Sequence, residues 1–140
     1  MPFIKKSVPE LQEEIQYYAN ALIGISGALA KKAPLSVNAR TIALKLENMA
    51  SEASGQKIAL LDKGEREIAT LYAQEIDTLA QLAEIFYGSE LENLGSGKAK
   101  KIDALCRILL ASAADAEKLF KEEAARQQIR LQYSGAEARA

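Results

Sequence analysis

Apolar residues recur three and four positions apart along most of the chain, a spacing that predicts amphipathic α-helices. The clearest run lies within residues 7–32, where the intervals between apolar positions alternate between three and four. A helix is expected to begin at Ser7, with Glu10 completing a capping box, and to end near Lys31 before Pro34. Its predicted inner face consists of Val8, Leu11, Ile15, Tyr18, Leu22, Ile25 and Leu29.

The next two predicted helices are bounded by capping residues and glycines. One begins at Ser36 and stops at Gly55. The other opens at Asp62, which forms a second capping-box pattern with Glu65, and ends at Gly88. The predicted inner face of this third helix consists of Ile68, Tyr72, Ile76, Leu79, Ala83 and Phe86.

A fourth helix is predicted from about Lys98 to about Tyr133, followed by a loose C-terminal tail at residues 134–140. Because the connections between the first three helices are short, neighbouring helices are expected to run antiparallel. We therefore expect residues 1–133 to form a single domain of the all-α class, an antiparallel four-helix bundle with a long C-terminal helix. The inner face of the last helix is predicted to hold Ile102, Leu105, Cys106, Leu109, Ala113, Ala116 and Phe120.

Composition removes most routes to catalysis. The chain of 140 residues has no histidine, no tryptophan and one cysteine, and acid–base, nucleophilic and transition-metal chemistry rely heavily on histidine and cysteine. The acidic residues at 10–14 and 62–65 lie in predicted first turns, where capping alone accounts for them. The segment Gly95–Lys98 lacks the spacing of a phosphate-binding loop. We expect no enzyme activity, no cofactor, no metal site and no small-molecule substrate.

The chain is also expected to be a cytoplasmic protein with no membrane partner. Its first residues contain no apolar segment of the kind that leads a secreted protein. The uncharged stretch at residues 19–30 is shorter than the roughly 20 residues that cross a bilayer. The single cysteine, Cys106, excludes an internal disulfide and is expected to be a buried thiol, which is typical of a reducing compartment.

Two features of the fourth helix go beyond a plain bundle. At 1.5 Å per residue it would be roughly 50 Å long, so its last turns should project beyond the shorter helices. It also carries apolar residues outside its predicted inner face, as does the first helix. A broadly apolar helix is usually covered on several sides. We therefore expect a non-catalytic subunit or adaptor that assembles with itself or with a larger complex through Ile23, Ile108, Leu110, Ile129 and Leu131.

The fourth helix offers an alternative function through its basic residues. These lie near its beginning and along one face, and such a stripe suits the phosphate backbone of a nucleic acid. On this interpretation the chain is a small helical subunit of a nucleoprotein complex. The plainer interpretation is a solvated face neutralised by Glu90, Glu92 and Asp103. The candidate nucleic-acid-binding residues are Lys98, Lys100, Lys101, Arg107, Lys118 and Lys121.

Overall fold

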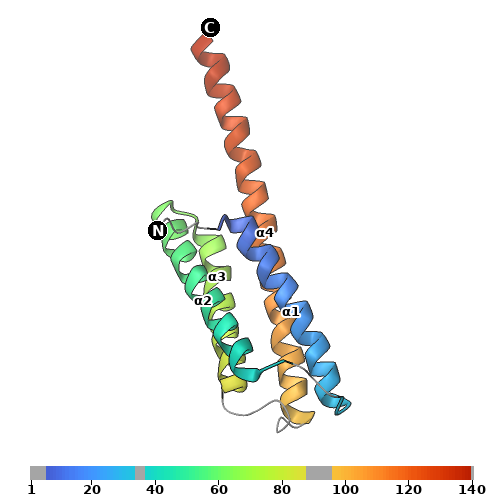
Figure 1. Ribbon diagram of the computed structural model, residues 1–140. Helices are drawn as coiled ribbons and strands as arrows, with labels where there is room; N and C mark the ends of the chain where they lie inside the picture. Colours follow the sequence, from blue (N-terminus) through green and yellow to red (C-terminus); the bar gives the residue numbers. More distant parts are fainter. Residues whose placement is uncertain (1–5, 34–36, 88–95, 140) are drawn as a thin grey trace.

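The computed structural model describes residues 6–33, 37–87 and 96–139, apart from the side chains of residue 96 and of residues 130–139. Over these ranges the secondary structure consists of four α-helices and contains no strand. They are α1 (Val8–Ala30), α2 (Ala39–Asp62), α3 (Arg66–Tyr87) and α4 (Ser96–Arg139). The predicted all-α class with a long C-terminal helix is confirmed (Figure 1).

Successive helices run in opposite directions, as an antiparallel bundle requires (Figure 1). The closest pairs are α1 with α4 and α2 with α3, and α3 also packs along α4, whereas α1 approaches α2 much less closely. The bundle therefore consists of two helix pairs, α1/α4 and α2/α3, joined mainly where α3 meets α4.

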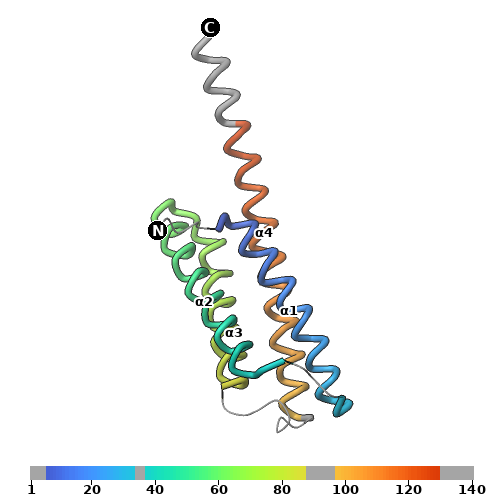
Figure 2. The backbone as a smooth tube through the Cα atoms, in the orientation of Figure 1, coloured from blue at the N-terminus to red at the C-terminus, as the bar shows by residue number. Residues whose placement is uncertain are grey.

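The helix α4 is much longer than its neighbours and leaves the bundle at one end (Figures 1 and 2). It contains 44 residues, against 23 in α1, and it extends to Arg139, whereas the sequence predicted an end near Tyr133. The side chains of residues 124–129 are all exposed. We call residues 124–129 the projecting segment, because the other three helices do not cover it.

The helix α1 begins as its sequence predicted. The Ser7 hydroxyl oxygen accepts a hydrogen bond from the Glu10 amide at 3.3 Å, and the Glu10 carboxylate accepts one from the Ser7 amide at 3.4 Å. The capping box is therefore confirmed. After α1, Lys32 takes a left-handed conformation with φ of 56°, and the Ala33 amide donates to the Ala28 carbonyl at 2.9 Å. This is a Schellman C-cap with a lysine in the position that usually holds glycine.

The boundary between α2 and α3 differs from the prediction. Gly55 lies inside α2, and Asp62 is the last residue of α2 rather than the cap of the next helix. A single glycine costs a helix only about 1 kcal/mol, and the continued helix buries Leu60. The turn forms at Gly64 instead, where φ is 80°. The N-terminal cap of α2 is Asn38; the predicted Ser36 lies outside the described residues.

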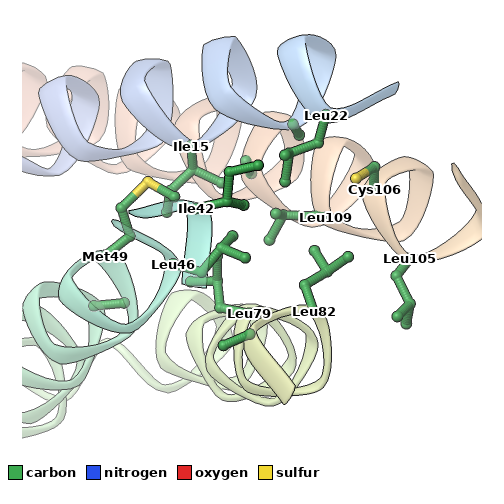
Figure 3. Close-up of a cluster of buried hydrophobic side chains, with 14 of the residues drawn as sticks. Ile15, Leu22, Ile42, Leu46, Met49, Leu79, Leu82, Leu105, Cys106 and Leu109 are labelled. Atoms are coloured by element: carbon green, nitrogen blue, oxygen red, sulfur yellow. The ribbon is translucent and has the colours of Figure 1, made fainter. Parts of the chain in front are cut away.

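The core lies between the four helices, and each contributes large side chains that meet there (Figure 3). Cys106 belongs to this core, and burial raises the pKa of its thiol to about 12, so the thiol stays protonated at neutral pH. None of the helices, as far as they are described, is both long and apolar enough to cross a membrane. Representative buried residues are Ile15, Leu22, Leu46, Met49, Leu79, Leu82 and Leu109.

Candidate interaction surface on α4

The apolar residues predicted to form an interface have different environments. Ile108 and Ile129 are exposed, with 43% and 53% of their surface accessible. Ile23 and Leu110 are partly buried and pack against the core of their own bundle. The side chain of Leu131 lies outside the described residues. The structure therefore leaves Ile108 and Ile129 available to another molecule and partly uses Ile23 and Leu110 within the fold.

Helix geometry places Ile108 and Ile129 on the same side of α4. Ile108 and Leu110 are two positions apart, so they point in directions roughly 160° apart around the helix axis. Ile108 and Ile129 are 21 positions apart, which brings their directions within roughly 60° and separates them by about 30 Å along the axis. Ile108 and Ile129 therefore lie on the same side of α4, and the exposed residues between them on that side include Asp115, Glu122 and Arg126.

The predicted basic stripe is partly neutralised within α4. The Arg107 guanidinium binds the Asp103 carboxylate at 2.9 Å, and the Lys121 ammonium binds the Glu117 carboxylate at 2.8 Å. These hydrogen bonds raise the pKa of Arg107 and of Lys121. The stripe therefore alternates positive with negative groups, and the plainer interpretation was correct in naming Asp103. Glu90 and Glu92 lie outside the described residues.

The remaining basic residues divide into two groups. Lys98, Lys100 and Lys101 are exposed in the first turns of α4 and form no ion pair with any other residue whose side chain is described. Lys118 instead lies among carboxylates. It lines a surface hollow of about 480 Å³ between α3 and α4 and another of about 380 Å³ between α1 and α4. The acidic residues around these hollows are Glu67, Asp115, Glu117 and Glu122.

The sequence reasoning missed an exposed apolar pair on α2. Leu44 and Ile58 have 46% and 62% of their surface accessible. They are 14 positions apart and point almost directly away from the core residues Ile42 and Leu46. Their spacing of two heptads is a signal that the sequence contains, and it places two exposed apolar side chains on the outside of the bundle, with Glu47, Asn48 and Ser51 between them.

The sequence reasoning also missed a buried polar pair that joins α1 to α3. Gln12 and Glu75 are both fully buried, and the Gln12 amide nitrogen donates a hydrogen bond to Glu75 Oε2 at 3.2 Å. The second oxygen of each side chain, Oε1 in both cases, is buried and has no hydrogen-bond partner within the described part of the chain. Burial raises the pKa of Glu75 to about 7, although the hydrogen bond from Gln12 opposes this.

The acidic first turn of α1 has structural contacts. Glu10 caps the helix, and Glu14 binds the ammonium groups of Lys6 and Lys45. Burial acts to raise the pKa of Glu14, but hydrogen bonds from Lys45 and Lys6 outweigh it and lower the pKa. Within the described ranges no three acidic or cysteine side chains come together in a way that would hold a metal ion.

Comparisons with known proteins give no assignment. No family model, no curated protein and no solved structure matches this chain. Function therefore has to be argued from the surfaces described above.

Proposed function

We propose that this chain is a non-catalytic helical subunit or adaptor that assembles through apolar helix faces. The observation that carries the proposal is the projecting segment of α4, residues 124–129, in which every side chain is exposed and Ile129 lacks cover from its own bundle. Helices in water gain most of their stability from tertiary packing of one face. A partner that covers this segment would supply that packing.

The free energy available from burying these isoleucines supports the proposed assembly. Full burial of an isoleucine side chain is worth about 1.5–3 kcal/mol. Because Ile108 and Ile129 are each about half exposed, covering both would contribute roughly that amount in total, before the cost of association. The form of assembly that we put forward for test is self-association through the α4 surface. A reducing compartment such as the cytoplasm suits the single buried Cys106.

The test makes the same substitution at exposed isoleucines on two helices. Ile129→Glu and Ile108→Glu place a charge in the proposed contact, and Ile58→Glu makes the same change on the outer face of α2. Size-exclusion chromatography with light scattering gives the mass of each variant, and circular dichroism checks that helicity is unchanged. We expect an oligomer for the original chain and for Ile58→Glu, and monomers for the two α4 variants.

Two results would overturn this assignment. A monomeric original chain at high and low salt would exclude self-association. Loss of the oligomer in Ile58→Glu, with both α4 variants still associated, would move the interface to the face formed by Leu44 and Ile58. An apolar contact should persist or strengthen as salt is raised.

The nucleoprotein alternative is supported by the exposed lysines 98, 100 and 101 and weakened by the carboxylates along the rest of the stripe. The same chromatography tests it if absorbance at 260 nm is recorded on protein not treated with nuclease. The chain has no tryptophan and five tyrosines, so bound nucleic acid would dominate that trace. A 260 nm peak that is lost at high salt would favour the alternative.

A further inference from the structure

The buried pair of Gln12 and Glu75 spans the diagonal of the bundle. The helix α1 packs mainly on α4, α4 also packs on α3, and α3 packs on α2, so α1 and α3 stand on opposite sides of the bundle. The hydrogen bond from Gln12 to Glu75 therefore reaches across the core and joins the α1/α4 pair to the α2/α3 pair. This hydrogen bond breaks if the two helix pairs move apart.

Among the residues whose side chains are described, no cation balances the carboxyl group of Glu75. Gln12 faces it from α1 and Tyr72 from its own helix, and the Tyr72 hydroxyl donates to the Gln56 amide oxygen of α2. Where side chains are described, α2 contributes no buried polar residue and α4 contributes only the uncharged Ser112. Glu117 of α4 lies on the side of the bundle where α1 packs, and its carboxylate binds Gln16 and Lys121 instead.

The unpartnered oxygens of the pair indicate where a proton belongs. An ionised Glu75 only accepts hydrogen bonds, so its Oε1 and the Oε1 of Gln12 both stay unsatisfied, as each does here. A proton on Glu75 Oε1 creates a donor, and the Gln12 amide oxygen is the acceptor that lacks one. A single proton would thus give the pair a donor where it has two acceptors without one.

We propose that Gln12 and Glu75 form a proton-operated latch, which holds the two helix pairs together while Glu75 is protonated and releases them when it ionises. An unpaired carboxylate in the core is costly, and the least costly relief is admission of water. The raised pKa of Glu75 supports the proposal, as does the absence of histidine, which leaves few other groups to titrate near neutrality. This proposal does not depend on the proposed assembly.

The fold also indicates where the latch opens. The end of α1 and the beginning of α2 lie at one end of the bundle, together with the end of α3 and the beginning of α4 (Figure 1). At the opposite end α1 meets α2 through polar groups, including the ion pair of Lys6 with Glu52 at 3.3 Å and the hydrogen bond from Gln56 to the Lys6 carbonyl at 2.8 Å. Polar contacts exchange readily for water, so the pairs separate at this end.

The first test follows the folding equilibrium with pH. In Glu75→Gln the introduced amide can donate and accept like the protonated acid but cannot ionise, and Glu84→Gln removes an exposed carboxylate from the same helix. With an ordinary pKa of 4.5 and a folded pKa of about 7, the unfolding constant of the original chain should rise roughly 30-fold from pH 5.5 to pH 8. Glu84→Gln should repeat this rise, and Glu75→Gln should remain within about threefold.

A Glu75→Gln variant that keeps the full pH dependence, or an original chain without any, would overturn the proposal. Infrared spectroscopy of the original chain gives a check that needs no variant. The carbonyl band of a buried carboxylic acid should be present at pH 5.5 and lost by pH 8, and a chain that lacks this band at pH 5.5 has no protonated latch.

Hydrogen exchange then separates a latch from general destabilisation. At pH 8 the amides of residues 8–15 in α1 should exchange faster in the original chain than in Glu75→Gln by more than the change in the global unfolding constant, whereas those of residues 105–113 in α4 should change by that global factor alone. An equal change in all four helices would show global unfolding without a separate opening of the two pairs, and the latch would be wrong.

Discussion

The buried Gln12–Glu75 pair predicts a strongly non-additive pair of substitutions. Both side chains are fully buried, and leucine has a comparable size and no polar atoms. In Gln12→Leu the carboxyl group of Glu75 loses its hydrogen bond and stays in the core without a partner. In Glu75→Leu the amide of Gln12 is left in the same position. In the double variant neither polar group remains, so neither desolvation cost remains.

The magnitudes follow from the count of unpaired groups. A buried polar group that loses its partner costs about 1–3 kcal/mol, so each single variant should be destabilised by that amount at pH 6. Replacement of both partners by apolar groups of similar shape is nearly neutral or stabilising. The double variant should therefore match or exceed the original chain, and the coupling free energy should be about 2 kcal/mol or more.

Urea unfolding followed by circular dichroism measures all four proteins. Thr78→Val is a matched control, because Thr78 is buried but its hydroxyl donates within its own helix, to the Gln74 carbonyl at 2.8 Å. This control should change the free energy of unfolding by less than about 1 kcal/mol. A double variant whose loss equals the sum of the two single losses would refute the reasoning, since it would show that the polar atoms contribute only packing.

Two further predictions concern the helix ends and the core. Lys32→Gly should raise the free energy of unfolding by roughly 0.5–1 kcal/mol, and Gly64→Ala should lower it by about 1 kcal/mol. Both positions have positive φ, which only glycine adopts without strain. Urea unfolding measures both changes, and changes of equal sign would contradict this prediction. Leu109→Ala should lower the free energy of unfolding by about 2–5 kcal/mol and Ile108→Ala by less than about 1 kcal/mol, because Leu109 is fully buried and Ile108 is not. Similar thermal unfolding midpoints for the two variants would show that Leu109 does not belong to the core.

The predictable part of the fold rests on local signals. Ser7 and Glu10 form a capping box that the sequence contains, and the apolar periodicity marks helices of the correct class and order. The prediction of the inner face of α1 was less accurate, since Tyr18 and Ile25 are only partly buried while Ala19 and Ser26 are buried. A straight helix turns every 3.6 residues, so a strict seven-residue pattern drifts off the true inner face.

The error at the end of α2 has a tertiary cause. Gly55 and the Asp62 capping pattern are genuine local signals for a break. They were outweighed because the helical continuation buries Leu60 and because Gly64 supplies the left-handed residue that ends α2. Local propensities of about 1 kcal/mol are smaller than the burial of one large apolar side chain, so tertiary packing decides such cases.

The candidate site was predictable only in part, for a similar reason. The spacing along α4 identified Ile108 and Ile129 as apolar residues off the inner face, and the structure leaves both exposed. Glu75 was overlooked because its charge places it outside any apolar pattern, although it lies seven residues from Ile68 and from Leu82, which are both buried. Whether a carboxyl group on the inner face is solvated or paired depends on the opposite helix, which one sequence segment does not specify.

The distribution of polar contacts along the bundle relates the latch to the proposed interface. At the end where the two helix pairs are connected through the chain, apolar side chains of both pairs, such as Leu22 and Leu82, belong to the same buried core (Figure 3). At the other end the contacts of Lys6 with Glu52 and of Gln56 with the Lys6 carbonyl are polar, and water can replace these partners at little cost. The projecting segment of α4 leaves the bundle at this same end (Figure 1). Opening of the latch would therefore expose apolar surface beside the segment proposed to bind a partner, which places proton release and assembly at one end of the molecule.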